Sequence, residues 1–474
     1  MFSFITAIIV LVIGYLVYGR LVEKVFGPDD RQTPAITMAD GVDFVPLKLW
    51  KSVLIQLLNI AGTGPIFGAL MGACFGPVVF LWIVFGAILA GAVHDFMSGM
   101  ISERHNGASI AELSGIYIGK PALYVMRGFS VLLLLLTGTV FVTSPAALIA
   151  RLSGLSNTFW IIVIIVYYVL ATLLPIDKII GRMYPVFGAV LIIMAVSIGG
   201  ASLFGAGYHI PEISLVNMHP EGLPVWPYMF VTVACGAISG FHATQSPMIA
   251  KCITSEKQGR KVFYGAMIME SVIALVWAAA GVAFYGGSQM LHEALSAAGQ
   301  SGVVYEISKG MLGAAGGILA IIGVVACPIT SGDTAFRSAR LILAEAMHLD
   351  QKSMRNRLMI TLPLLGIGAC LTQIDFNVLW RYFSWSNQTL AMISLWVASV
   401  YLLRNAAHKY YSLITALPAV FMTAVSVTYI LMAKEGLRLP ASFAYHVGIW
   451  FAVSHLAFYL LMLSERKNPL SKRK

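Results

Sequence analysis

Long apolar runs separated by short polar segments recur along the whole chain. A helix that crosses a bilayer needs about 20 mostly apolar residues, and the pattern predicts thirteen such spans. The sequence between them is too short for a separate soluble domain, so we expect one all-α polytopic membrane domain over residues 1–474. The predicted spans cover residues 3–22, 50–75, 77–101, 121–150, 157–175, 181–205, 226–250, 262–286, 311–331, 356–373, 376–403, 411–433 and 441–463. The longest predicted loops are 21–49, 206–226 and 287–310.

The composition supports a chain whose solvent is lipid. Hydrophobic residues make up 58% of the 474 positions and charged residues only 11%, whereas soluble domains carry roughly 25% charged residues. A chain this apolar could not bury its surface in soluble domains, and its small charged fraction argues against disorder. The five cysteines form no Cys-x-x-Cys pair, so we expect reduced packing residues rather than disulfides or a metal site.

The net charge of +10 could indicate a nucleic-acid partner, but the distribution of basic residues argues against one. When the N-terminus is placed outside and the spans alternate, 26 of the 31 Lys and Arg residues fall on the cytoplasmic side. This is the asymmetry of the positive-inside rule. We therefore expect an inner-membrane protein with an outer N-terminus and a cytoplasmic C-terminus. The five basic residues on the outer side are Arg151, Lys309, Arg381, Lys434 and Arg438.

Two spans carry helix-breaking sequences near their centres. Gly62-Thr63-Gly64-Pro65 interrupts the span 50–75, and Cys235-Gly236-Ala237-Ile238-Ser239-Gly240 interrupts the span 226–250. Glycine and proline weaken helices, although both are common in membrane helices. The two spans lie five apart and run in opposite directions. Interrupted helices at matching places in two inverted halves are the best sequence indication of a transporter binding site.

The breaks also suggest a chemistry. A half-helix that begins near the midplane presents free N–H groups and a positive dipole end, which suit a substrate carboxylate. A half-helix that ends there presents carbonyls, which suit a cation or an ammonium group. The substrate candidates are Gly62, Thr63, Gly64, Gly236, Ser239, Gly240, Phe241, His242, Gln245 and Asn387.

Several polar residues within the spans have both a functional and a structural interpretation. His94-Asp95 could support the site, or Asp95 could form a structural salt bridge with Arg104. His242 could bind substrate or be a satisfied packing residue, and Glu270 could pair with Lys261. The polar belt around Asn387 could line the pathway or hold helices together by hydrogen bonds.

Thr330-Ser331-Gly332-Asp333-Thr334 is expected to end the span 311–331. Its hydroxyls and carboxylate are hard oxygen ligands that suit a small coupling cation. Asp333 could instead carry a proton, since burial favours the neutral acid. The structural alternative is a helix-end cluster in which Asp333 pairs with Arg337 or Arg340.

The sequence shows no mark of several other functions. It contains no Walker loop, no Arg-rich voltage sensor, no potassium-filter sequence, and no His-Glu-x-x-His or Gly-x-Ser-x-Gly motif. We therefore expect neither an enzyme nor an ATP-driven pump, and no cofactor beyond a coupling proton or sodium ion.

Five stretches in collinear order resemble the carbon starvation protein A (CstA) family. Together they extend over most of the chain, which makes the resemblance specific. They are Asn59-Ile-Ala-Gly-Thr-Gly-Pro-Ile-Phe-Gly68, Ala90-Gly-Ala-Val-His-Asp-Phe-Met-Ser-Gly99, Arg104-His-Asn-Gly-Ala-Ser109, Ala234-Cys-Gly-Ala-Ile-Ser-Gly-Phe-His242 and Ser386-Asn-Gln-Thr-Leu-Ala391.

The resemblance implies a secondary transporter of the amino acid-polyamine-organocation superfamily with a leucine-transporter-type five-plus-five inverted repeat. The repeats would be residues 50–205 and 226–403, preceded by an extra helix at 3–22 and followed by two helices in 411–463. The family is linked to uptake of peptides, and of pyruvate by proton symport, during nutrient limitation. The resemblance also implies that hydroxyls such as Ser331 and Thr334 join carbonyls of the first broken helix to bind sodium.

The resulting hypothesis is a cation-coupled symporter for short peptides or pyruvate-like carboxylates. Its partners would be a small-molecule substrate and membrane lipid, and the sequence does not indicate an oligomeric state. The alternatives are an uncoupled channel or facilitator, which would not accumulate its solute, and a starvation sensor, which would lack turnover.

Overall fold

The structure is a computed structural model that describes residues 1–41, 44–173, 176–205, 207–351 and 353–465. Within these ranges every regular element is a helix. The first half of the chain contains α1 (Phe2–Leu16), α2 (Tyr18–Phe26), α3 (Pro34–Thr37), α4 (Leu49–Ala61), α5 (Gly64–Ala73), α6 (Val79–Leu81), η1 (Trp82–Gly91), α7 (Ala92–Arg104), α8 (Ile110–Tyr117), α9 (Lys120–Ser153), α10 (Asn157–Leu173) and α11 (Ile176–Phe204). The predicted cytoplasmic basic cluster in 466–474 lies outside the described ranges.

The second half is also helical. Its elements are η2 (Val225–Met229), α12 (Phe230–Thr232), α13 (Gly240–Ala250), η3 (Glu256–Gln258), η4 (Arg260–Tyr264), α14 (Gly265–Tyr285), α15 (Ser288–Ile321), η5 (Ile322–Ala326), α16 (Cys327–Ala346), α17 (Met354–Leu371), α18 (Phe376–Asn405), η6 (Lys409–Ser412), α19 (Leu413–Met432) and α20 (Ala441–Glu465).

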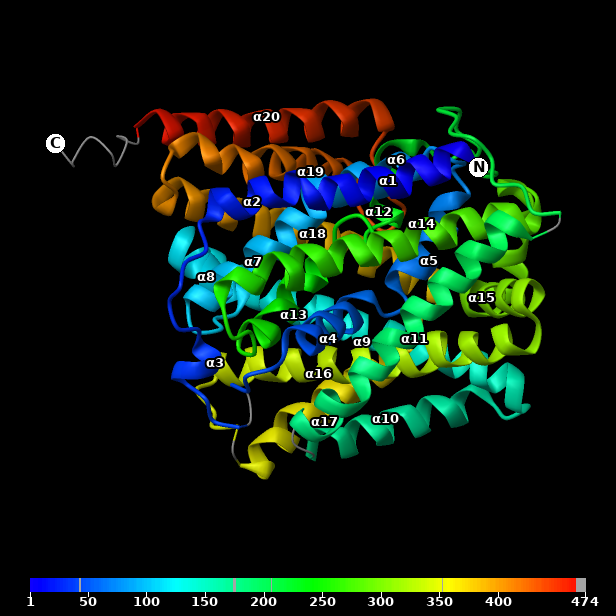
Figure 1. Cartoon of the computed structure of the whole chain (residues 1–474), viewed down its shortest axis with the longest axis horizontal. Helices are drawn as coiled ribbons and strands as arrows, with labels where there is room; N and C mark the ends of the chain where they lie inside the picture. Colours follow the sequence, from blue (N-terminus) through cyan, green and yellow to red (C-terminus); the bar gives the residue numbers. More distant parts are fainter. Residues whose placement is uncertain (42–43, 174–175, 206, 352, 466–474) are drawn as a thin grey trace.

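The helices form a bundle whose long axis most of them follow (Figure 1). Figure 1 shows α4 and α13 in the middle of the bundle, with α20 along one edge and α10 and α17 along the other. Outer helices such as α1 and α20 expose large apolar side chains, including Phe2, Trp450 and Phe458. Apolar side chains on the outside of a bundle suit a lipid environment, which agrees with the predicted all-α membrane architecture.

Eight helical stretches among the described residues are long and apolar enough to cross a membrane, and a ninth is added if α4 and α5 are one bent span. The predicted count of thirteen spans therefore remains a prediction. Residue 1 and the end of α20 lie at opposite ends of the bundle (Figure 1). That placement agrees with an odd number of crossings.

Two predictions about the region from 287 to 346 are wrong. The expected loop 287–310 is helical, because α15 runs from Ser288 to Ile321 and bends at Gly299 and Gly313, where φ is +68° and +64°. Helical structure then continues through η5 and α16 to Ala346. Thr330–Thr334 therefore lies inside a helix rather than at the end of one.

Both predicted breaks are present. α4 ends at Ala61 and α5 begins at Gly64, with a bend of 49° between them. Gly62 has φ +45°, a conformation that glycine adopts at little cost. In the second half, residues 233–239 separate α12 from α13, and Gly236 has φ +92°. These two breaks lie in the buried centre of the protein, where nearly all residues from Gln56 to Leu70 and from Val233 to Ser246 are buried.

Candidate functional site

The two helix breaks lie against each other. A methyl group on Gly64 would lie 2.5 Å from the Sγ of Cys235, and one on Gly236 would lie 2.5 Å from Ala274 and 3.6 Å from Pro65. The backbone approach between α5 and residues 235–236 therefore depends on glycine at both positions. Segments far apart along the chain thus form one central region, as their matching sequence positions predicted.

The N-terminus of α5 opens into this region without a side-chain cap. Thr63 is the N-cap residue but makes no capping hydrogen bond, and Pro65 follows in the first turn. The buried Oγ1 of Thr63 and the buried Oδ1 of Asn59, which flank the break, have no hydrogen-bond partner among the described residues. An uncapped helix N-terminus with an unpaired hydroxyl donor beside it is suited to an anionic group, whereas the oxygen of Asn59 accepts and would need a donor.

The N-terminus of α13 is closed, in contrast. Asn387 on α18 accepts hydrogen bonds at Oδ1 from the amide N–H of Phe241 at 2.8 Å and from the hydroxyl of Ser239 at 2.9 Å. Asn387 therefore caps α13 from another helix. It holds the two helices together by hydrogen bonds and also lies at the candidate site, so both predicted roles apply. Its Nδ2 is buried and has no partner in the described part of the chain.

Two carbonyls near the end of the preceding half-helix already accept hydrogen bonds. The indole Nε1 of Trp82 donates to Val233 at 3.1 Å, and the Nε2 of Gln388 donates to Phe230 at 2.8 Å. The sequence predicted free carbonyls here for a cation or an ammonium group. These two side chains occupy that position instead.

Four buried ionisable side chains form a chain beside the second break. The Nδ1 of His94 lies 2.8 Å from Oδ1 of Asp95, and the Nδ1 of His242 lies 2.8 Å from Oδ2 of the same carboxylate. On the other side of the imidazole, the Nε2 of His242 lies 3.4 Å from Oε2 of Glu270. All four side chains have no exposed surface. We call these residues the buried acid–histidine chain.

Two structural alternatives from the sequence are wrong. Asp95 does not pair with Arg104, whose guanidinium instead binds Glu256 at 2.8 and 2.9 Å near the end of α7. Glu270 faces His242 rather than Lys261, because it lies in the second turn of α14 on the face that packs toward α13 and α7. His242 itself is not an isolated packing residue, since carboxylates lie on both sides of its ring.

The predicted cation cluster on α16 is dispersed. The hydroxyls of Thr330 and Thr334 donate to carbonyls of their own helix, those of Cys327 and Ser331. Asp333 pairs with Arg337 at 3.3 Å, one turn further along, which is the structural alternative that the spacing allowed. Only Ser331 reaches the first break, where its Oγ donates to the carbonyl of Leu58 at 3.1 Å.

Gln245 is buried but turns away from the acid–histidine chain. Its Nε2 donates to Thr244 at 3.0 Å and to Ser338 at 3.3 Å on α16. The structure thus brings Gly62–Gly64, Gly236, Ser239–His242, Asn387, Asp95 and Ser331 around the breaks. It places Asp333, Thr334 and Gln245 in other contacts. Sequence reasoning missed Cys235 as a contact of the first break, and the partnership of Glu270 with His242.

A polar cavity of about 220 Å³ lies at the C-terminal end of α5. Met71, Cys74, His219, His292, Gln300 and Asn377 are among its lining residues. Burial, and secondarily the neighbouring His292, lowers the pKa of His219, which lies in the segment before η2. His219 is therefore mostly neutral at pH 7. In the predicted topology this cavity is on the outer side, above the breaks.

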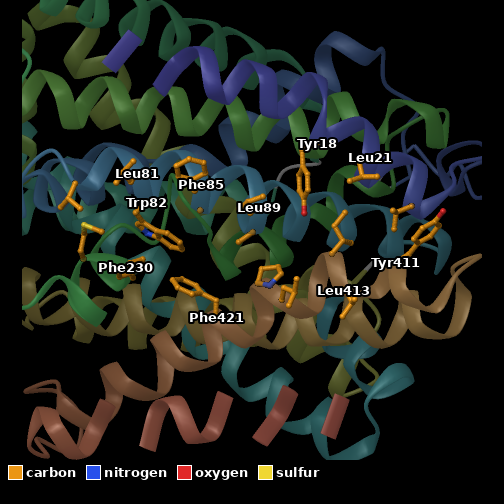
Figure 2. A pocket seen from close by; sticks show the side chains of 18 of the residues that line it. Tyr18, Leu21, Leu81, Trp82, Phe85, Leu89, Phe230, Tyr411, Leu413 and Phe421 are labelled. Carbon is orange, nitrogen blue, oxygen red and sulfur yellow. The ribbon is translucent and has the colours of Figure 1, made fainter. Parts of the chain in front are cut away.

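A larger cavity, of about 760 Å³, is an apolar groove between α2, η1 and α19. Figure 2 shows Leu81, Trp82, Phe85, Phe230 and Phe421 around it. None of the described residues that line it is charged. A carboxylate would find no charged partner there, so this groove is not the candidate substrate site.

Comparison with known proteins identifies the family. The family model for carbon starvation protein CstA matches residues 1–151, 125–292 and 291–429. The chain belongs to this family. The resemblance drawn from the five collinear motifs is therefore confirmed.

Relatives within the CstA family include named transporters. An uncharacterized membrane protein of Haemophilus influenzae is 44% identical over 351 residues, covering 63% of this chain and 95% of that protein. The peptide transporter CstA of Bacillus subtilis is 24% identical, covering 90% of this chain and 89% of that protein. The pyruvate/proton symporter BtsT of Escherichia coli is 28% identical, but the match covers 57% of this chain and only 47% of that protein.

Solved structures of secondary transporters share the fold. A mutant of the manganese transporter of Eremococcus coleocola superposes with a TM-score of 0.53 at 12% identity, covering 90% of this chain and 99% of that chain. The inward-facing structure of Mhp1 gives a TM-score of 0.51 at 16% identity, covering 86% and 90% of the two chains. The named relatives and these structures are transporters, so the prediction that the CstA-family chain is not an enzyme is confirmed.

Proposed function

We propose that this CstA-family protein is a cation-coupled symporter that takes up a small carboxylate-bearing nutrient, either a pyruvate-like acid or a short peptide. Residues 50–205 and 226–403 would form two inverted five-helix repeats in an inner membrane, with the N-terminus outside and the C-terminus in the cytoplasm. The substrate would bind between the breaks of the two repeats. Alternating access would then be a rocking of one helix group against the other around this site.

The observation that carries the proposal is the uncapped N-terminus of α5 at the point where the two breaks meet. Helix N-termini bind anions because their N–H groups and dipole point at the ligand. Asn59 and Thr63 add two buried polar atoms that have no partner among the described residues. A buried polar group without a partner costs about 1–3 kcal/mol. A substrate carboxylate would remove this cost at the hydroxyl of Thr63, which can donate, whereas the oxygen of Asn59 accepts and would need a donor such as bound water.

The other break favours a substrate without an obligatory ammonium group. Trp82 and Gln388 already donate to the carbonyls of Val233 and Phe230, where the amino group of a peptide would otherwise bind. Among the substrates linked to the relatives, a pyruvate-like monocarboxylate therefore fits these contacts better than a peptide. The name of the Escherichia coli relative supports the same choice.

Uptake of labelled pyruvate into proteoliposomes tests the proposal. The vesicles carry an inward proton gradient, contain no sodium, and are measured with and without excess dipeptide. We expect accumulation above the external concentration, which a facilitator cannot produce, and we expect a protonophore to abolish it. Competition by dipeptide would extend the substrate class to peptides. Absence of both accumulation and exchange for pyruvate and for dipeptides would contradict the proposal.

A further inference from the structure

We propose that the buried acid–histidine chain, His94–Asp95–His242–Glu270, binds and carries the coupling proton, with Glu270 as the group that loads and releases it. This inference rests on the proposed symport function and names its coupling ion and the residues that hold it. The sequence suggested Asp333 on α16 as the proton carrier, whereas we assign this role to Glu270 on α14. Asp333 is already paired with Arg337.

The geometry fixes the role of each member. Both oxygens of Asp95 accept hydrogen bonds from imidazole Nδ1 atoms, those of His94 and His242, at 2.8 Å each. A carboxylate that accepts two N–H donors is stabilised in its ionised form. Asp95 is therefore a permanent anion that holds the ring of His242 with Nδ1 protonated. The remaining nitrogen of that ring, Nε2, then faces Glu270.

Glu270 differs from Asp95 in its partners. No side chain of the described residues donates a hydrogen bond to its carboxylate, the backbone N–H of Gly236 lies close to it, and its closest cationic partner is Nε2 of His242 at 3.4 Å. The Nε2 atoms of His94 and His242 are also buried without a hydrogen-bond partner in the described ranges. The coupling proton can therefore exchange most easily between Nε2 of His242 and the carboxylate of Glu270.

Charge balance indicates how many protons the chain holds. Two ionised carboxylates beside two neutral imidazoles would place two negative charges in a region without exposed surface, and buried net charge is costly. Two protons neutralise the four groups, for example as a His242 imidazolium, an Asp95 carboxylate and a Glu270 carboxylic acid. Loss of the Glu270 proton leaves one net negative charge. Water that reaches Glu270 when the site opens would stabilise this charge.

Few other ionisable groups face this chain. His94 and Asp95 come from α7, Cys235 from the segment before α13, His242 from α13 and Glu270 from α14. From α4 and α18 the nearby polar side chains are Gln56 and Asn387, which do not ionise. Gln56 lies 3.5 Å from Ser246, whose hydroxyl donates to the carbonyl of His242 at 2.9 Å.

The second break connects the proton position to the substrate position. Cys235 lies on the path, because its Sγ is within 4.8 Å of the ligand atoms of His242 and Glu270 and also closely approaches Gly64 at the N-terminus of α5. Movement of α13 relative to α7 and α14 would separate His242 from its two carboxylates. Substrate binding between the breaks and proton exchange at Glu270 would therefore depend on the same rearrangement.

One proton carried with one monocarboxylate moves no net charge. Accumulation of pyruvate should consequently follow the pH gradient, and an imposed membrane potential should change it less than twofold. The same measurement with sodium salts inside and outside should give the same accumulation as the sodium-free vesicles.

The decisive variant is Glu270→Gln, which mimics the protonated acid and cannot release the proton. We expect this variant to exchange labelled for unlabelled pyruvate at a rate within about threefold of wild type. Its accumulation driven by the proton gradient should fall at least tenfold. Glu306→Gln is the matched control, because Glu306 is a partly exposed carboxylate that pairs with Arg151 on another helix. This control should keep both activities.

A second readout does not depend on the substrate. Infrared difference spectra of the purified protein between acidic and alkaline pH should contain, among the bands of the other titrating carboxyl groups, one carboxylic-acid band that belongs to Glu270 and is present in wild type and in Glu306→Gln. This band should be missing from Glu270→Gln, whereas the bands of the other carboxyl groups should remain. If wild type neither exchanges nor accumulates pyruvate but shows this band, the substrate assignment fails while the proton site stands.

Three results would overturn the proton assignment. The first is proton-driven accumulation by Glu270→Gln at the wild-type level. The second is a set of carboxylic-acid bands that is the same in Glu270→Gln as in wild type. The third is accumulation that requires sodium, or that a chelator abolishes and added Zn²⁺ restores, since Cys235, His242 and Glu270 lie close enough for a divalent ion to contact them all.

Discussion

The hydroxyl of Ser331 donates to the carbonyl of Leu58 at 3.1 Å, which joins α16 to the last turn of α4 just before the first break. These residues are 273 positions apart, and both are fully buried. The bond connects the first predicted repeat to the second at the point where α4 loses its regular hydrogen bonding. It is also the one member of the predicted cation cluster that reaches this break.

Replacement of Ser331 tests what this bond does. Ser331→Ala removes the donor and leaves the Leu58 carbonyl without it, a net loss of about 1 kcal/mol. We expect a fall of roughly three- to tenfold in pyruvate uptake, in line with an energy of that order in the transport cycle. Ser202→Ala is the control, because the Ser202 hydroxyl donates to Ile198 of its own helix and otherwise makes only a weak contact with the sulfur of Met311 at 3.7 Å. A sodium requirement in wild type that weakens in Ser331→Ala would indicate a sodium site here instead of the proposed proton coupling.

The contact between the two breaks predicts the effect of a single methyl group. Gly64→Ala would place Cβ 2.5 Å from Sγ and 2.6 Å from Cβ of Cys235, and overpacking of this kind costs about 1–3 kcal/mol. We expect uptake to fall at least tenfold and the melting temperature to decrease. Gly128→Ala in α9 is the control, because nothing lies within 4 Å of its added Cβ.

A double variant makes the same prediction more specific. Cys235→Gly removes both atoms that the methyl group added in Gly64→Ala would meet, so it should restore part of the stability that this substitution loses. A double-mutant cycle measures this interaction directly. Strict additivity of the two changes would show that the breaks do not touch in the way described here.

The interhelical cap on α13 gives a stability prediction. Asn387→Ala removes the acceptor for the Phe241 amide and the Ser239 hydroxyl, and loss of a helix cap costs about 0.5–2 kcal/mol. We expect a lower melting temperature for Asn387→Ala and a smaller decrease for Asn387→Asp, which keeps an acceptor oxygen but adds a buried charge. Ser394→Ala on the same helix should have little effect, because that hydroxyl donates to the carbonyl of Leu390 one turn earlier in its own helix. Equal stability of the Ala and Asp variants would argue against the cap.

Local sequence predicted the breaks but not their partners. Gly62, Pro65, Gly236 and Gly240 are visible as helix breakers because their effect on the backbone is local. The partnership of Glu270 with His242 depends on how α13 and α14 pack, and the sequence separation of these residues does not reveal it. The sequence did allow the pairing of Asp333 with Arg337 to be predicted as an alternative, because residues four apart are neighbours on a helix.

The segment 287–310 shows a different limit. Its polar residues and glycines lower its mean hydropathy, so a membrane-span criterion assigns it to a loop. The structure makes it helical and accommodates Gly299 and Gly313 as bends. Hydropathy identifies lipid-facing spans, whereas this helix has a buried face that includes Gln300 and Ser301.

Acid-dependent stability is expected at the turn between α7 and α8. Burial, and then the nearby Glu345, raises the pKa of Glu112, whose carboxylate also completes the capping box of α8 with Ser109. A raised pKa means that the folded state favours the protonated acid. Stability from this group is therefore greatest below the ordinary glutamate pKa of about 4.3 and is lost as the pH rises through the higher folded value.

Glu112→Gln should remove this dependence, because glutamine can still cap the helix but does not repel Glu345. We expect the variant to melt at a higher temperature than wild type at pH 8, by on the order of 1 °C. The difference should disappear near pH 4. Thermal unfolding in detergent at both pH values provides the measurement. A variant that is less stable than wild type at pH 8 would contradict the repulsion.

The last prediction concerns the C-terminal end of α7. Arg104 donates from Nε and Nη2 to the two oxygens of Glu256, from Nη2 to the carbonyl of Gly27, and from Nη1 to Tyr401 at 3.0 Å. Its guanidinium also lies 4.1 Å over the ring of Phe26. A lysine cannot reproduce this planar set of donors. Arg104 therefore joins α2, η3 and α18 to the end of the helix that holds His94 and Asp95.

Removal of this guanidinium should leave the buried carboxylate of Glu256 without its main partner, which costs about 3–5 kcal/mol for a buried pair. We expect Arg104→Ala to be strongly destabilised, Arg104→Lys to be intermediate, and Glu256→Gln to recover part of the loss when combined with Arg104→Ala. Arg151→Lys is the control, because its own side chain is about half exposed and its partner Glu306 is partly exposed, and exposed pairs contribute little. Thermal unfolding of the four variants gives the ranking. If Arg104→Lys matched wild type, the planar contacts to Gly27, Tyr401 and Phe26 would contribute nothing, and a simple charge at the end of α7 would suffice.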